Sequence, residues 1–335
     1  MNPATEPSAK PKLLALIGPT AVGKTRLSLD IAKAWNAEII SGDSIQVYRG
    51  MDIGTAKIKP EEREGVPHHM IDICDPAHPF SVAEFQERCA ALIPEIQSRG
   101  KLPFIVGGTG LYVESVAYGY GFADVGSDDA FREEMAQYAL ANGAEALHAK
   151  LRAVDPQAAE RLHPNDRRRV IRALEVHRLT GTTFSEQQAG QKKTSPFELC
   201  IVGLTMDRAE LYARINERVE LMLAEGLIEE VRGLLERGVP EGAVSMHGLG
   251  YKEIVPYLQG HLSLDQTVEL LKRDTRHFAK RQLSWFRHMP DINWIDAGEN
   301  FNKNLQAIHA IIAGKFRMEP EYNVNQPFDD GGNAQ

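Results

Sequence analysis

The feature that most constrains this chain is a glycine-rich loop close to its start. Residues 18–25 read Gly-Pro-Thr-Ala-Val-Gly-Lys-Thr, which matches the phosphate-binding pattern G-x-x-x-x-G-K-[ST] at every fixed position. A short apolar run at 13–17 precedes the loop, and a segment with helical spacing follows it at 25–35. A strand, a loop and a helix in this order aim backbone N–H groups and the helix N-terminus at one anion.

The residue types of the loop predict its chemistry. The glycines allow the backbone to turn toward a phosphate, Lys24 reaches the phosphate oxygens, and the Thr25 hydroxyl can bind Mg²⁺. We therefore predict a diphosphate or nucleotide site with Mg²⁺ as cofactor, formed by Gly18, Pro19, Thr20, Ala21, Val22, Gly23, Lys24 and Thr25. The loop specifies a phosphate group and not a nucleotide, because a diphosphate ester suits the same cradle.

Strand and helix signals alternate outside one internal segment. Apolar runs predict further strands at 38–41, 69–73, 102–106, 199–204 and 292–295, and helical spacing predicts helices at 80–99, 166–179, 208–236 and 264–288. Alternation of this kind predicts an α/β fold, a P-loop NTPase-like parallel sheet flanked by helices. We expect disordered tails at 1–11 and 316–335, a core divided into 12–121 and 166–315, and an Ala-rich helical insertion at 122–165.

Several classes of protein are disfavoured by composition. The chain has no apolar run of about 18 residues and no apolar stretch typical of a secretion signal. Cys74, Cys89 and Cys200 lie far apart and form no Cys-x-x-Cys pair, so we expect reduced thiols in a cytoplasmic protein. The net charge of −8 argues against nucleic acid as a partner, although a local positive face can override it.

The strand ends offer a candidate base in an unusual place. A P-loop NTPase carries an Asp at the end of an apolar strand, but the run at 102–106 leads into Gly107, Gly108 and Thr109 without an acid. Asp43 instead follows the strand at 38–41, and both strand ends should face the loop in a parallel sheet. Asp43 is thus a candidate general base with Thr109 close by, the alternatives being a capping Asp and a plain glycine-rich turn.

Seven segments, taken in order, resemble the tRNA dimethylallyltransferase family. They lie at 18–25, 43–49, 51–57, 106–112, 172–176, 250–253 and 279–287, and the resemblance runs from about Lys12 to Asp296. It implies transfer of a dimethylallyl group from dimethylallyl diphosphate to the exocyclic amine of the adenine 3′ of the anticodon. The tRNAs would be those that read codons beginning with U, and diphosphate would be released. The end of the chain has no Cys/His pairs, so it resembles the short bacterial type without a zinc-binding extension.

The resemblance also implies roles for particular residues. Asp43 would accept the proton, with Thr109 beside it, and Arg214 or Arg218, with Arg218 preferred, would meet the diphosphate. The implied tRNA contacts are Asp43, Ser44, Ile45, Gln46, Thr109, Arg132, Arg168, Arg169, Val170, Ile171, Arg172, His247, Gly248, Leu249, Gly250, Tyr251 and Lys252. We expect a monomer whose partners are the tRNA anticodon stem-loop and dimethylallyl diphosphate, with no membrane partner.

Two basic segments are candidates for the RNA surface. Residues 166–178 hold five arginines and two acids, and residues 266–290 hold six Lys or Arg and two acids. Lys280 and Arg281 in the second segment are predicted to contact tRNA phosphates. The alternative is a solvated charged face with aromatic residues in the core, and we place both Trp285 and Phe286 in the core.

Three other functions remain compatible with the loop. A P-loop small-molecule kinase would turn over ATP, whereas the transferase would consume dimethylallyl diphosphate without ATP. A prenyltransferase acting on free adenine nucleotides would not need the basic segments. A P-loop switch protein that binds RNA would bind a nucleotide and leave the prenyl diphosphate untouched.

Overall fold

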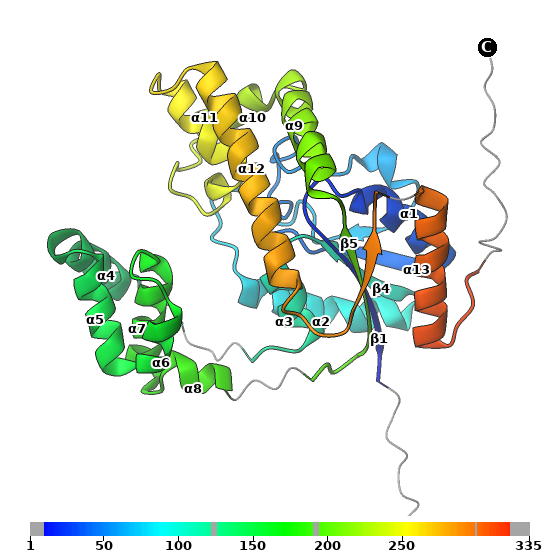
Figure 1. Ribbon diagram of the computed structural model, residues 1–335, viewed down its shortest axis with the longest axis horizontal. Coiled ribbons are helices and arrows are strands. Elements are labelled where there is room, and N and C mark those ends of the chain that lie inside the picture. Colours follow the sequence, from blue (N-terminus) through cyan, green and yellow to red (C-terminus); the bar gives the residue numbers. More distant parts are fainter. Residues whose placement is uncertain (1–9, 122–125, 190–193, 299, 322–335) are drawn as a thin grey trace, which may run out of the picture. The chain divides into compact units, whose positions relative to one another are not determined.

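The computed structural model describes residues 10–121, 126–189, 194–298 and 300–321 and divides into two compact units (Figure 1). Residues 120–194 form a helical unit, and the rest of the chain forms an α/β unit. The predicted boundary of the insertion at 165 is therefore wrong. The two predicted disordered tails, 1–11 and 316–335, are also too long. The ordered structure includes residue 11 near the start of the chain and extends to residue 321 near its end. Pro11 O accepts a hydrogen bond from Glu198 N at 2.9 Å, and Glu321 N donates to Ala34 O at 2.8 Å.

The α/β unit is built on a six-stranded sheet in which every pair of neighbours is parallel. Its order is β3-β2-β4-β1-β5-β6, with bounds β1 Lys12–Ile17, β2 Ala37–Ser41, β3 His68–His69, β4 Leu102–Gly107, β5 Glu198–Thr205 and β6 Ile292–Asp296. The predicted parallel α/β fold is confirmed. The strand predicted at 69–73 ends after His69, because Met70 and Asp72 adopt positive φ angles of 62° and 57°.

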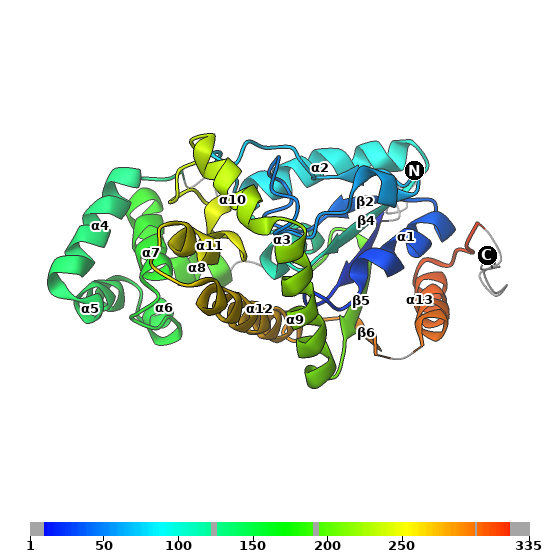
Figure 2. The ribbon, with the colours of Figure 1, turned by 90° about the horizontal axis from the view of Figure 1, so that it is seen from above.

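Helices cover both faces of this sheet (Figures 1 and 2). On one face α1 (Lys24–Ala34) and α13 (Phe301–Phe316) contact each other and share a core with Leu14 and Leu16 of β1. On the other lie α2 (Val82–Ser98) and α3 (Gly110–Ala117). The predicted cap of α2 is present, since Ser81 Oγ accepts a hydrogen bond from Glu84 N. Helices α3 and α13 lie outside the segments whose spacing predicted a helix.

The second half of the α/β unit contributes α9 (Arg208–Ala224), α10 (Leu227–Glu236), α11 (Tyr251–Leu258) and α12 (Leu264–Phe286). One helix was predicted over 208–236, but the chain breaks at Gly226, which has a φ of 101°. Two short 3₁₀ turns, η1 (Pro60–Arg63) and η2 (Ser245–His247), complete the unit. Helix α12 packs against α9, α11 and α3. Two of these helices come directly after strands of the sheet, since α3 follows β4 and α9 follows β5.

The helical unit has its own apolar core. It comprises α4 (Asp129–Asn142), α5 (Ala144–Val154), α6 (Pro156–Arg161), α7 (Arg167–Thr180) and α8 (Phe184–Ala189). The apolar face of α7 packs on α4 and α5, and Val170 is fully buried in one cluster with Phe131 and Leu151. This packing explains why the insertion continues past 165. Within the described ranges, no helix is long and apolar enough to cross a membrane.

Candidate active site

The site lies where β1, β2 and β4 end, because parallel neighbouring strands deliver their following loops to one edge. Strand β1 leads into the glycine-rich loop, β2 leads to Asp43, and β4 leads to Thr109. The last two loops touch, since Thr109 N donates to Gly42 O at 3.2 Å. A side chain at Gly107 would place its Cβ 2.3 Å from that same carbonyl oxygen, so only glycine permits this approach.

The loop at 18–25 forms a cradle around a cavity of about 320 Å³. The Lys24 ammonium folds back to donate to Gly18 O at 2.9 Å and to Pro19 O at 2.7 Å. Gln282 holds the cradle in place from α12. Its Oε1 accepts from Thr20 N at 2.9 Å, and its Nε2 donates to Gly108 O at 2.9 Å. The sequence analysis missed Gln282, and helical spacing alone does not separate it from its neighbours.

The cradle holds two basic side chains, Lys24 and Arg218, whose charged forms are disfavoured by burial. Burial, followed by the nearby charge of Arg218, lowers the pKa of Lys24 from 10.5 to about 7, and Asp43 opposes this shift. Burial also lowers the pKa of Arg218. Arg218 lines the cavity and has no hydrogen-bond or ion-pair partner among the described residues. Two enclosed basic side chains, neither of which forms an ion pair among the described residues, favour the binding of an anion.

Arg218, and not Arg214, faces the cradle. Arg214 is exposed one helical turn earlier on α9, and its Nη2 donates to Glu210 Oε1 at 2.8 Å. Arg214 lines neither cavity described here. The prediction that Arg214 binds the diphosphate is not supported by this placement, because its guanidinium is engaged with an acid on the outer face of the helix.

A second cavity, of about 290 Å³, adjoins the cradle and is more apolar. The two cavities share six lining residues, namely Thr20, Asp43, Thr55, Ala56, Arg218 and Phe278. The further walls of the second cavity include apolar side chains, namely Ile45, Ile215, Val219, Met222, Leu249 and Leu271. A cavity lined by basic side chains thus opens directly into a more apolar chamber, an arrangement that can hold a ligand with an anionic group and an apolar chain.

Asp43 stands at the junction of the two cavities. Its Oδ1 accepts from Ile45 N at 2.8 Å and from Gln46 N at 3.3 Å, so it caps the following turn. The carboxylate nevertheless lines both cavities, and its Oδ2 has no hydrogen bond among the described residues. The capping and catalytic readings are therefore compatible. Thr109 Oγ1 accepts from Ser44 N at 3.1 Å, and Thr109 lines the second cavity.

Most of the residues expected to contact tRNA in the α/β unit surround the second cavity. These are Ser44, Ile45, Thr109, His247, Gly248, Leu249, Gly250, Lys252 and Arg281, while Gln46 lines the cradle. Tyr251 is the exception, because its side chain is fully buried behind this wall. Lys280 is exposed on α12.

The residues expected to contact tRNA in the helical unit divide into two groups. Arg168 and Arg169 are exposed, and Arg132 and Arg172 bind the buried carboxylate of Glu175 at 2.8 Å and 2.6 Å. Val170 and Ile171 are buried in the core of the unit. Their side chains are unavailable to RNA, so the prediction that they contact tRNA fails for the side chains. The helical period turns these two positions inward.

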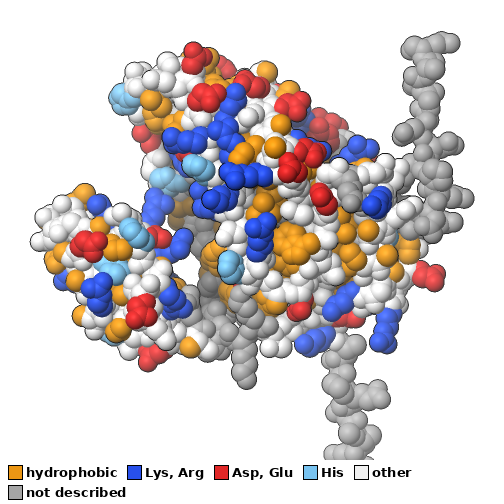
Figure 3. Space-filling model, viewed as in Figure 1, with side chains coloured by type: hydrophobic (Ala, Val, Ile, Leu, Met, Phe, Trp, Pro, Cys, Tyr) orange, Lys and Arg blue, Asp and Glu red, His pale blue; other side chains and the backbone are white. Residues whose placement is uncertain are grey.

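The basic face of α12 is partly neutralised. Lys272, Arg273 and Arg276 bond to Glu220, Asp274 and Asn216. Lys280, Arg281 and Arg287 have no ion pair among the described residues, and Lys and Arg side chains gather over α12 on the surface seen in Figure 3. Phe286 is buried as predicted, but Trp285 is 41% exposed, so the prediction for Trp285 is wrong. Its indole packs on Gly110, and its Nε1 donates to Glu114 Oε2 at 2.9 Å.

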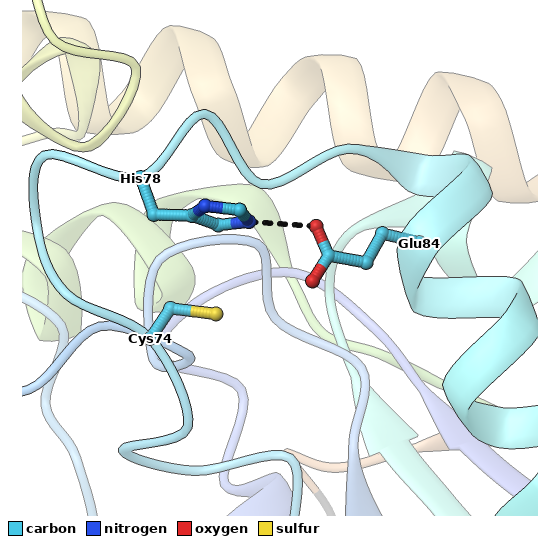
Figure 4. Close-up of side chains that lie close together, drawn as sticks. All are labelled: Cys74, His78 and Glu84. Atoms are coloured by element: carbon cyan, nitrogen blue, oxygen red, sulfur yellow. Dashed lines mark hydrogen bonds and ion pairs between the residues drawn. The ribbon is translucent and has the colours of Figure 1, made fainter.

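Two places in the described structure offer groups of a kind that can bind a metal ion. Thr25 lines the cradle, and its hydroxyl has no partner among the described residues, which fits a ligand of Mg²⁺ beside a diphosphate. The second place is a cluster of Cys74, His78 and Glu84 (Figure 4).

The cluster of Cys74, His78 and Glu84 is satisfied by hydrogen bonds alone. Glu84 Oε1 accepts from the Arg88 guanidinium at 2.8 Å and 3.1 Å, and Glu84 Oε2 pairs with His78 Nε2 at 2.8 Å. Burial raises the pKa of the Cys74 thiol, which favours its protonated form. A guanidinium bound to the carboxylate opposes a second cation there, so we assign no metal to this cluster.

Comparison with known proteins places these observations among relatives. A family described as IPP transferase matches residues 46–289, and one described as isopentenyl transferase matches residues 11–75. The chain is 53% identical over 310 residues to the tRNA dimethylallyltransferase of Geobacillus thermodenitrificans, covering 92% of this chain and 98% of that protein.

Solved structures agree with this comparison. The full-length tRNA isopentenylpyrophosphate transferase from Bacillus halodurans is 50% identical, with a TM-score of 0.71 and coverage of 92% of this chain and 97% of that one. A eukaryotic dimethylallyltransferase studied acting on tRNA is 29% identical, with a TM-score of 0.78 and coverage of 93% and 81%.

Proposed function

The chain belongs to the tRNA dimethylallyltransferase family, and we propose that its two joined cavities carry out the transfer at the adenine 3′ of the anticodon. The chain is a prenyltransferase whose relatives act on tRNA. The donor is dimethylallyl diphosphate, and the tRNAs are those that read codons beginning with U. The observation that carries the proposal is the opening of a cationic diphosphate cradle into an apolar chamber at Asp43.

The donor has two chemical parts, a charged diphosphate and an apolar dimethylallyl chain, and each part matches one of the two cavities. The diphosphate lies in the cradle, where Lys24 and Arg218 neutralise its charge. The dimethylallyl chain enters the apolar chamber beside Ile215 and Phe278. Thr25 would hold Mg²⁺, which supplies further stabilisation of the negative charge on the diphosphate.

The reaction forms one bond and breaks one. The exocyclic nitrogen of the adenine bonds to the allylic C1 of the donor as the bond from C1 to the diphosphate oxygen breaks. This nitrogen is a weak nucleophile because its lone pair is delocalised into the ring, so the residues act mainly on the departing charge. Lys24 and Arg218 meet the growing charge on the bridging oxygen, and Asp43 Oδ2 takes the proton from nitrogen.

The acceptor base must leave the stack of the anticodon loop to reach Asp43. Unstacking a base from a single-stranded loop costs only a few kcal/mol. Lys280 and Arg281 lie on α12, the helix that lines the chamber through Phe278, and Arg287 directly follows its last residue. These three side chains can bind the phosphates beside such a base. A tRNA substrate also argues for action in the cytoplasm, and we propose that the chain acts as a monomer.

The proposal is tested by incubating the purified chain with Mg²⁺, labelled dimethylallyl diphosphate and an unmodified anticodon stem-loop. We expect label in the adenine that follows the anticodon, and no requirement for ATP. A matched stem-loop with guanine at that position is the control and should remain unlabelled. ATP turnover without transfer would establish a kinase and overturn the proposal. Transfer to free adenosine monophosphate at an equal rate would refute the tRNA acceptor.

A further inference from the structure

One carboxylate outside both cavities joins two of their walls. Glu230 lies on α10, and its Oε2 accepts from Asp52 N at 2.9 Å and from Ile53 N at 2.8 Å. Its Oε1 accepts from Gly54 N at 3.1 Å and from the Tyr251 hydroxyl at 2.6 Å. A single side chain thus satisfies three consecutive backbone N–H groups and a phenol. Neither cavity is lined by Glu230 itself.

The four donors come from two segments of the chain that each contribute residues to the chamber wall. Gly54, Thr55 and Ala56 line the chamber from the loop that follows β2, and Gly250 and Lys252 line it from the start of α11. Tyr251, between the last two, is fully buried and points away from the chamber toward Glu230.

The two wall segments are also in direct contact. A Cβ at Gly54 would lie 2.6 Å from the Tyr251 ring, so the loop approaches the ring too closely for any residue but glycine. The loop has a second anchor on its far side, where Gln46 Nε2 donates to Thr55 O at 3.1 Å. Besides the hydrogen bonds within the loop, residues 54 and 55 are thus tied to Glu230 through Gly54 N and to Gln46 through Thr55 O.

Within the described residues, the Glu230 carboxylate makes no ion pair in addition to these four hydrogen bonds. No Lys or Arg among the described residues forms an ion pair with it, and its partners are neutral donors. Hydrogen bonds to a charged acceptor are about twice as strong as neutral ones, so this carboxylate is a strong tie. Burial and the adjacent Glu230 carboxylate raise the pKa of Tyr251 well above 10, which keeps the phenol a donor.

We propose that Glu230 is a positioning residue that fixes the width of the prenyl chamber and so determines which chain lengths the enzyme accepts. The inference rests on the proposed function of this site as the dimethylallyl pocket. When two substrates differ by one methylene, a hydrophobic pocket discriminates between them by only about 1–3 kcal/mol in transition-state binding. It reaches this discrimination only where its walls resist displacement. Rejection of a ten-carbon donor therefore depends on wall segments that do not move when a longer chain presses on them. Glu230 bonds to two such segments, through Gly54 and Tyr251.

The test is the ratio of kcat/KM for dimethylallyl diphosphate to kcat/KM for geranyl diphosphate. Replacing Glu230→Gln keeps the size of the side chain, but its amide nitrogen cannot accept. With that nitrogen at the Oε2 position, Asp52 N–H and Ile53 N–H lose their acceptor. With it at the Oε1 position, Gly54 N–H loses its acceptor, while the Tyr251 hydroxyl can turn to accept from the amide. We expect the ratio to fall by about tenfold, with dimethylallyl transfer reduced and geranyl transfer retained or increased. Tyr251→Phe removes one of the four bonds and should lower the ratio in the same direction by less.

The matched control is Glu229→Gln, which removes an exposed acid from the adjacent position of the same helix. We expect both kcat/KM values of this control to equal those of the unchanged protein. A variant that merely lowers the folded fraction reduces both donors alike and leaves the ratio constant. An unchanged ratio in folded Glu230→Gln refutes the inference, and if that variant does not fold, an unchanged ratio in Tyr251→Phe refutes it. Failure of the unchanged protein to transfer either chain would instead refute the proposed function.

Discussion

The lowered pKa of Lys24 makes diphosphate binding sensitive to pH in a range where an ordinary lysine is inert. Burial and the charge of Arg218 place this pKa at about 7, so the ammonium loses its proton as the pH rises through 7. A bound diphosphate puts negative charge beside the ammonium and raises the pKa again. Protonation therefore accompanies binding above pH 7, and the affinity must fall as the pH rises.

The size of the effect follows from the pKa of the empty site. Below pH 6 Lys24 is already charged, so its protonation does not alter the affinity. Above pH 7 each unit of pH weakens binding by about tenfold, for as long as the pKa of the complex exceeds the pH. Between pH 6 and pH 9 the dissociation constant should thus rise by about a hundredfold, or about 2.7 kcal/mol.

The assay is titration calorimetry of inorganic diphosphate, the reaction product, in metal-free buffer from pH 6 to pH 9. Diphosphate itself titrates in this range, so the same series is measured on Lys24→Arg, whose guanidinium stays charged. The difference between the two series isolates Lys24. Arg218→Gln removes the second cause of the lowered pKa of Lys24. In this variant, the pH above which the affinity for diphosphate begins to fall should therefore be higher. Parallel series for the unchanged protein and Lys24→Arg would refute the reasoning.

Further predictions concern the base, the RNA surface and the core. Asp43→Asn should slow transfer by about 10²–10⁴ with stem-loop affinity within a factor of a few, measured by single-turnover transfer and RNA binding; loss of binding without loss of turnover would count against a catalytic base. Replacing both Lys280 and Arg281 by Ser should reduce the slope of log K against log salt by about 2, and an unchanged slope would remove them from the interface. Burial lowers the pKa of His309 to about 4, so the folded protein resists the protonation that the unfolded chain undergoes below about 6.5. The free energy of unfolding should therefore fall between pH 6.5 and 4, and less so in His309→Gln, as measured by urea unfolding; equal losses in both proteins would contradict this.

The sequence alone determined the parts of this protein whose physics is local. The cradle is contiguous in the chain, and the type and spacing of its glycines, lysine and threonine predict phosphate binding. Strand β1 and helix α1 are equally local, since an apolar run and a helical period identify them. The cap of α2 at Ser81 was predictable for the same reason, because the capping groups lie three residues apart.

Only the tertiary structure decided how distant residues combine. Arg214 and Arg218 are one helical turn apart and equivalent in sequence, yet packing exposes the first and encloses the second. Gln282 supports the cradle across 262 positions of sequence, and Glu230 reaches Gly54 across 176. Trp285 and the end of the helical unit were misplaced because burial depends on which elements meet. A side chain's role at a site is determined by the neighbours that folding brings to it, and in one sequence no local pattern records those neighbours.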